Sequence, residues 1–120
     1  MPDSAESSGQ TRTTDWGSLQ WLASREIGNA QGLTLGRVVI RKGCANPRHR
    51  HDNCEEVLYL LKGRLEHSVG DEKMVLEPGD VIVIPPGVSH HAVSIGEEDA
   101  EAVIAYDAGE RHYEPESEEG

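Results

Sequence analysis

Two histidines and a glutamate near the middle of the chain have a spacing that could bind a metal ion. His49 and His51 are two residues apart, so on a β-strand both imidazoles would lie on the same face. Asp52 and Asn53 favour a turn, which would bring Glu56 back beside the two rings. Burying an unpaired carboxylate costs free energy, and a divalent cation would satisfy all three groups together. The segment therefore predicts a metal site.

A third imidazole could come from further along the chain. His90 and His91 follow the turn Pro85-Pro86-Gly87, and only one of them can point inward because strand side chains alternate. The register set by the turn favours His90 and places His91 outside. Three neutral nitrogens and one carboxylate suit Fe, Mn, Ni, Cu, Co or Zn and do not distinguish among them. The predicted ligands of one divalent ion are His49, His51, Glu56 and His90.

Other polar residues in these segments are candidates for lesser roles. Glu55 is the alternative carboxylate ligand if the strand register shifts by one residue. His67 shares a strand face with Leu65 and Val69, so it could also point inward. Such a histidine could contact a substrate or transfer a proton, or it could be an ordinary hydrogen-bonded interior residue.

Five more residues have weaker signals. Arg37 and Tyr106 could line the mouth of a barrel, but the sequence does not fix their strand phase. His112 lies in an acidic segment and is expected to be solvated. Trp16 and Trp21 are expected to be packing or interface residues.

Short β-rich runs broken by Gly, Pro and Asp recur along most of the chain. This pattern is typical of an all-β sandwich or barrel. Strands are expected at 33–41, 56–61, 64–69, 73–76, 81–84, 88–95 and 101–106. Residues 16–27 could form a strand, a hairpin or a short helix.

The two ends are expected to lie outside the folded unit. Residues 1–14 are mostly small and polar, and residues 107–120 are acidic and lack a hydrophobic period. Neither end can bury enough apolar surface to offset the entropy lost on ordering. The predicted organisation is a flexible segment at 1–14, one barrel at 15–106 and a flexible acidic tail at 107–120.

Composition narrows the classes of partner. The formal net charge is −11, so nucleic acid and anionic membranes are poor partners, and no apolar run approaches the length of a membrane helix. The N-terminus lacks a secretory signal pattern, which predicts a cytoplasmic protein with reduced thiols. Cys44 and Cys54 are then expected to be free, with a disulfide between them as the alternative.

The two histidine-bearing segments resemble the two sequence motifs of the cupin superfamily. The first motif is Gly, five residues, His-x-His, three or four residues, Glu, six residues and Gly. The residues at its fixed positions are Gly43, His49, His51, Glu56 and Gly63. The second is Gly, five residues, Pro-x-Gly, two residues, His, three residues and Asn. Its counterparts are Gly79, Pro85, Gly87 and His90, with Ser94 in place of Asn.

This resemblance implies a double-stranded β-helix, a small jelly-roll-like barrel with the metal ion inside. It implies an enzyme that acts on a small oxygenated molecule, with a dioxygenase similar to flavonol-cleaving cupins favoured. A sugar or sugar-acid isomerase or lyase, a non-catalytic small-ligand binder and a purely structural metal are the alternatives. Glu56 could also loosen and act as a base, a role suggested for the family. A homodimer is expected, with residues 16–22 as its contact arm.

Overall fold

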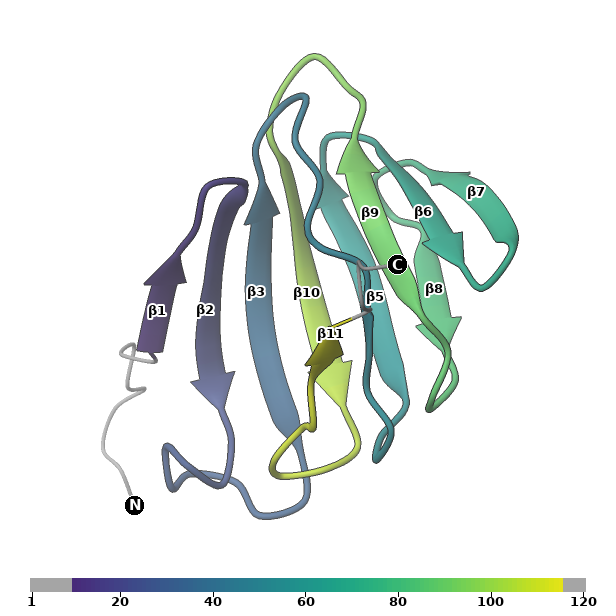
Figure 1. Cartoon of the computed structure of the whole chain (residues 1–120). Coiled ribbons are helices and arrows are strands. Elements are labelled where there is room, and N and C mark those ends of the chain that lie inside the picture. The colour runs from purple at the N-terminus through teal and green to yellow at the C-terminus, as the bar shows by residue number, and fades with distance from the viewer. Residues whose placement is uncertain (1–9, 116–120) are drawn as a thin grey trace.

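The computed structural model describes residues 10–115, which form strands, turns and loops without a helix. The parts of the expected flexible ends at 1–9 and 116–120 lie outside the described residues. The strands form two antiparallel sheets (Figure 1). The all-β class and the jelly-roll-like arrangement predicted from the sequence are confirmed.

One sheet has six strands and the other has five. The larger sheet contains, in spatial order, β1 (Gln10–Thr13), β2 (Gly17–Ala23), β3 (Thr34–Ile40), β10 (Ala100–Tyr106), β5 (Glu56–Lys62) and β8 (Val81–Ile84). The smaller sheet contains β11 (Glu114–Pro115), β4 (His49–Arg50), β9 (His90–Ser94), β6 (Leu65–Val69) and β7 (Glu72–Leu76). The expected strands therefore agree with the structure to within two residues at each end.

Alternation along the strands separates the interior from the surface. On β5, Leu58 and Leu60 are buried, whereas Tyr59 and Leu61 are each 43% exposed. Strand β10 follows the same period, because every second residue from Ala100 to Tyr106 is buried. Since β5 and β10 are hydrogen-bonded neighbours, their inward side chains form one continuous wall of the core.

The fold extends beyond the predicted barrel, 15–106, at both ends. Strand β1 pairs with β2 along all of its length, and residues 17–23 are a strand rather than a helix. At the other end, Asn53 accepts a hydrogen bond from the backbone N–H of His112 and donates one to the carbonyl of Glu110, both at 2.8 Å. The segment that makes these polar contacts has no apolar periodicity, so its place in the fold could not be predicted from a hydrophobic pattern.

Gly63, the last fixed position of the first motif, shows why glycine is needed there. Its φ is +87°, and a Cβ would lie 2.6 Å from the Cα of Ala100. Gly79 has a similar φ of +97° but open space around it. A substitution at Gly79 would therefore cause backbone strain without a steric clash.

Gly63→Ala is expected to lower the free energy of unfolding more than Gly79→Ala. Left-handed strain costs about 1–2 kcal/mol at either position, and forcing a methyl group into packed backbone adds about 1–3 kcal/mol at Gly63. Urea unfolding of the two variants beside the native protein measures the difference. Equal losses would mean that Ala100 moves away without cost.

Candidate metal centre

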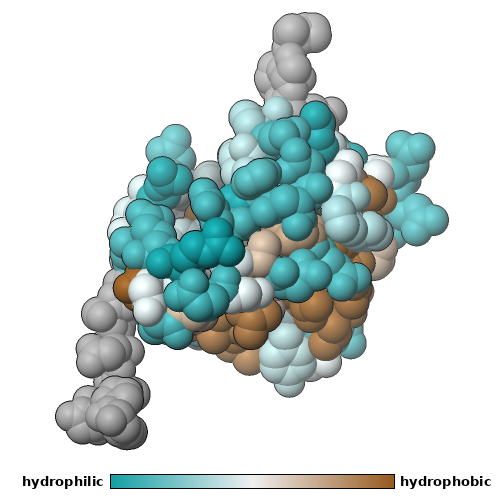
Figure 2. Space-filling model, turned by 90° about the horizontal axis from the view of Figure 1, so that it is seen from below, coloured by the Kyte–Doolittle hydropathy of each residue, from teal (hydrophilic) through white to brown (hydrophobic). Residues whose placement is uncertain are grey.

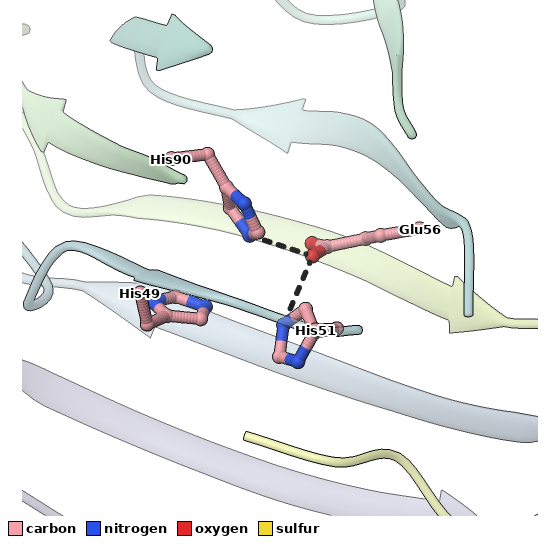
Figure 3. Close-up of side chains that lie close together, drawn as sticks. All are labelled: His49, His51, Glu56 and His90. Atoms are coloured by element: carbon pink, nitrogen blue, oxygen red, sulfur yellow. Dashed lines mark hydrogen bonds and ion pairs between the residues drawn. The ribbon is translucent and has the colours of Figure 1, made fainter. Parts of the chain in front are cut away.

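The four predicted ligands come from three strands and the loop that follows β4. His49 lies on β4 and His51 follows that strand directly, whereas Glu56 and His90 are the first residues of β5 and β9. His49 and His90 are paired across β4 and β9, and Asp52 and Asn53 lie in a bend that returns the chain toward Glu56. Figure 3 shows that the four side chains converge on one point.

The donor atoms are close together and buried. One ligand atom from each residue lies within 4.8 Å of all the others, and every one of the four side chains is at most 7% exposed. Oε1 of Glu56 lies 3.0 Å from Nε2 of His90 and 3.5 Å from Nε2 of His51. Two donors about 2.1 Å from an ion and at right angles to each other would be about 3 Å apart, so this spacing fits a coordination sphere.

Backbone carbonyls orient the three imidazoles. Each Nδ1 lies within hydrogen-bonding distance of a carbonyl oxygen, and because a carbonyl only accepts, Nδ1 carries the proton. The pairs are His49 with Pro47 at 2.7 Å, His51 with His112 at 2.8 Å, and His90 with Val88 at 2.9 Å. This tautomer leaves the lone pair of each Nε2 available to a metal ion, which is the arrangement typical of metal-bound histidines.

One buried nitrogen in the cluster has no hydrogen-bond partner, and a bound cation would satisfy it. Nε2 of His51 is buried and makes no hydrogen bond, although the carboxylate of Glu56 is nearby. Imidazole lone pairs that face a carboxylate repel it unless a proton or a metal ion lies between them. The residues present therefore fit a bound divalent ion.

Burial and neighbouring charges set the protonation of these groups. Burial lowers the pKa of His49 to about 4, which keeps the imidazole neutral at pH 7. Burial alone would raise the pKa of Glu56, but the close contacts of its carboxylate with the imidazoles of His51 and His90 outweigh burial and hold that pKa well below its usual range. A neutral imidazole and an ionised carboxylate are the forms that bind a metal ion.

A cavity of about 350 Å³ lies directly against the ligands. His49, Glu56 and His90 form part of its wall, and most of the remaining wall is apolar, with Leu58 and Ile104 among the lining side chains. A metal ion bound here would face a space large enough for a small molecule, as catalytic metal sites do.

The C-terminal strap, defined here as residues 110–115, closes over one side of the ligands. The carbonyl of His112 accepts the hydrogen bond from His51, and the Tyr113 ring stacks on the His49 ring at a centroid distance of 4.7 Å. Strand β11, at the end of the strap, pairs with β4. Sequence reasoning missed this element, whose only signals are the isolated Arg111 and Tyr113 in an acidic run.

The side chains with uncertain strand phase now have positions. Tyr106 is buried and lines the cavity, where burial, followed by the charge of Glu56, raises its pKa well above the usual value. Arg37, whose phase the sequence left open, is on the outer face, paired with Glu101, and does not line the cavity. Glu55, the alternative ligand, is exposed, and its backbone N–H donates to Asp107.

The other tryptophans and histidines considered in the sequence lie outside the ligand cluster. Trp16 and Trp21 are half-buried and pack against the core. His91 is half-buried, with Nδ1 3.3 Å from the guanidinium of Arg48. His112 has an exposed side chain 2.9 Å from Asp52, so its contribution to the site comes from its carbonyl.

Both cysteines are free. Burial raises the pKa of Cys54 to about 11, so its thiol stays protonated at neutral pH. The alternative of a disulfide with Cys44 is not seen in the structure.

His67 lies inside the barrel, as its strand phase predicted. It lines the cavity, is 2% exposed, and has a buried Nδ1 without a hydrogen-bond partner. Its ring is parallel to that of His90, with centroids 6.1 Å apart. Burial lowers the pKa of His67 to about 4, below its value of 6.5 in an unfolded chain.

Acid is expected to destabilise the metal-free protein through His67. Below pH 6.5 the unfolded chain binds a proton that the folded chain does not bind until about pH 4. Stability should therefore fall by about 1.4 kcal/mol per pH unit as the pH decreases through this window. His67→Gln should remove this part of the slope in urea unfolding, whereas His112→Gln controls for loss of an imidazole. An unchanged slope in His67→Gln would contradict the assignment.

No helix of the length and hydropathy that a membrane span requires occurs in the part of the chain that the structure describes.

Comparison with known proteins places this site in a family. The profile of the family described as "Cupin domain" matches residues 36–106, which contain all four converging residues. An uncharacterized protein of Methanocaldococcus jannaschii is 30% identical over 84 residues, covering 70% of this chain and 67% of that protein. A germin-like protein of Arabidopsis thaliana (subfamily 3 member 2) is 31% identical over 74 residues, covering 58% of this chain and 33% of its own length.

The fold is shared with larger proteins. Oxalate decarboxylase of Lactobacillus farciminis, solved as a formate complex, aligns with a TM-score of 0.83 at 21% identity. The alignment covers 89% of this chain and 33% of that one. The chain thus spans about a third of the length of the germin-like protein and of the decarboxylase. Its fold, its two motifs and the family match agree, and the chain belongs to the cupin superfamily.

Proposed function

We propose that this protein is a metal-dependent enzyme that acts on a small oxygenated organic molecule. The observation that carries the proposal is the position of the four clustered donors, three of which, His49, Glu56 and His90, line a cavity of about 350 Å³. A purely structural ion needs no such space beside it, because its coordination is closed by the protein. The buried donors and the adjacent cavity together favour a catalytic role over a structural one.

The residues of this chain have separable roles in the proposal. His49, His51, Glu56 and His90 would hold one divalent ion, which would supply Lewis acidity and a place for dioxygen or substrate oxygen atoms. His67, neutral and with an unpartnered Nδ1, is placed to accept a proton from a molecule in the cavity. The apolar wall excludes water and strengthens each electrostatic interaction inside.

Among the possible reactions, we favour an oxidation that uses dioxygen. Oxalate oxidase shares this fold, with a TM-score of 0.77 at 23% identity, and its name states oxidation of a small oxygen-rich acid. Oxalate decarboxylase shares it as well. These names support a small oxygenated substrate. The choice of an oxidation over isomerisation or elimination is the part that the experiment must decide.

The test combines metal analysis with measurements of oxygen uptake and of product formation. Protein purified without a His-tag or chelator is analysed for bound metal, then assayed for oxygen uptake with small hydroxy acids, dicarboxylates and enolic aromatic compounds. Uptake that falls in His67→Gln but not in His112→Gln supports the proposal. Product formed without oxygen uptake would reassign the protein to the isomerase or lyase class. Saturable binding without any product would make it a binding protein.

We also propose a homodimer in the cytoplasm, with a contact surface different from the arm at residues 16–22. Trp16 and Leu19 line the cavity of their own barrel, so they are not available as a free arm. By contrast, Tyr59, Val81 and Val83 on the outer face of β5 and β8 are 43–54% exposed. Hydrophobic surface also gathers along one margin of the molecule when it is viewed from below (Figure 2). Such surface commonly marks an interface.

Tyr59→Lys is expected to convert the dimer to a monomer, because a lysine would place a charge in the centre of the contact. Light scattering at micromolar concentration measures the mass. Val75→Lys, an exposed position on β7 of the other sheet, is the control. A native protein that is already monomeric at this concentration would overturn the proposal.

A further inference from the structure

Two arginines reach the cavity beside the metal centre. Arg111 comes from the C-terminal strap and Arg12 from β1, so both belong to segments near the ends of the described chain. Glu56 is the one carboxylate among the described residues that line the cavity, and it faces His51 and His90. With a divalent ion on the four ligands, the charge around this cavity would be positive although the chain has a net charge of −11.

Aromatic rings hold the guanidinium of Arg111 in place. Its Cζ lies 4.5 Å from the centroid of the Trp21 ring, 5.3 Å from that of Tyr113 and 5.6 Å from that of Tyr106. No carboxylate within residues 10–115 forms an ion pair with it. An arginine fixed by aromatic contacts loses less side-chain entropy when it binds an anion, and its planar fork matches a carboxylate.

The same rings connect Arg111 to the metal ligands. Tyr113 stacks on His49, with ring centroids 4.7 Å apart, and the guanidinium of Arg111 also lies over the Tyr113 ring. Tyr106 similarly lies 5.0 Å from His51, centroid to centroid. The guanidinium is therefore about one aromatic ring away from the ligands, within the length of a small organic molecule.

We propose that Arg111 binds a carboxylate group of the ligand, so that the molecules this cavity prefers are small organic acids. One end of the acid would reach the metal centre, and a carboxylate would pair with the guanidinium. Arg12, which is exposed at the cavity, adds positive charge without a fixed geometry. The inference rests on the proposed function for the metal, but the arginine itself does not depend on that metal.

The experiment compares acids with neutral molecules of the same shape. Isothermal titration calorimetry measures binding of malonate and malonamide, and of succinate and succinamide, to protein loaded with the metal it purifies with. Arg111→Gln should weaken binding of the acids about tenfold or more, because a hydrogen-bonded charge pair is lost, and leave the amides within about twofold. Arg111→Lys, which keeps the charge but not the fork, should fall between. Arg37→Gln, an arginine on the outer face, changes the net charge equally and should have no effect.

The bound metal is measured in every variant, which separates the possible outcomes. If Arg111→Gln loses metal and weakens acids and amides equally, the arginine only holds the strap in place, and the proposal is overturned. Acids that bind native protein and Arg111→Gln equally well also overturn it. If no metal binds to the native protein, the proposed function fails. The acid-over-amide preference is then measured on the metal-free protein, where Arg111 is still expected to produce it.

Discussion

The His90→Ala protein is expected to purify with little or no bound metal, where the native protein holds about one equivalent. His90 supplies one of four buried donors, and its Nε2 lies 3.0 Å from the carboxylate of Glu56. Changes to residues that only support a ligand already weaken metal binding about 10–100-fold, so loss of the ligand itself should exceed that range. Elemental analysis and competition with a chelator of known affinity measure the effect.

His91→Ala is the matched control for this substitution. His91 is the next residue of β9 and lies on the opposite side of the strand, half-buried beside Arg48. It should keep its metal. Circular dichroism shows whether each variant is folded, since an unfolded His90→Ala protein would lose metal for a trivial reason. A folded His90→Ala protein with a full equivalent of metal would remove His90 from the site.

A chain that ends at Gly109 is expected to bind metal about 10–100-fold more weakly than the full chain. The deletion removes the carbonyl of His112, which fixes the tautomer of His51, and the ring of Tyr113, which stacks on His49. The four ligands remain, so the site should weaken without disappearing. Metal affinity and the rate of metal release to a chelator are the quantities to measure.

Two further variants distinguish the effect of losing the strap contacts from an effect of shortening the chain. Removing only residues 116–120 should leave metal affinity unchanged. Asn53→Ala, which loses the two hydrogen bonds between its side chain and the strap but keeps the pairing of β11 with β4, should give a smaller loss of the same kind. Asn29→Ala is its control, because the Asn29 side chain also makes two hydrogen bonds to backbone, accepting from the N–H of Ser24 and donating to the carbonyl of Leu22, and neither involves the strap. Equal metal affinity in the full chain, in the chain that ends at Gly109 and in Asn53→Ala would show that the strap does not support the site.

The sequence was informative where local rules determine geometry. The spacing of His49 and His51 and the turn at Asp52 and Asn53 predicted that a carboxylate returns beside the two rings. The spacing to Gly63 then favoured Glu56 over Glu55, and the structure has Glu56 buried and Glu55 exposed. The turn before β9 gave His90 its inward position in the same way. Apart from the spacing to Gly63, these conclusions need only the two-residue period of a strand and the chemistry of turns.

Long-range contacts were out of reach for the same reasoning. The acidic segment after Tyr106 has no apolar period, so its position against His49 and His51 follows from tertiary contacts alone. His112 contributes through its backbone carbonyl. Every residue has such a carbonyl, so the residue type does not predict this contact. Arg37 was uncertain because it is an exposed member of a strand whose phase the sequence left open.

The strap follows all four ligands along the chain, and this order bears on when the protein acquires its ion. The ligand partners are far apart in sequence, as in the contacts of His49 with His90 and of His51 with His112, so the pocket cannot form until the sheets have assembled. The strap is held by β4 and His51, so it can close only once β4 has paired with β9. An ion could enter the unlatched site at that stage, and closure would then slow its exchange. The metal found in the mature protein would then reflect the ions available where the chain folds as well as the intrinsic preference of the donors.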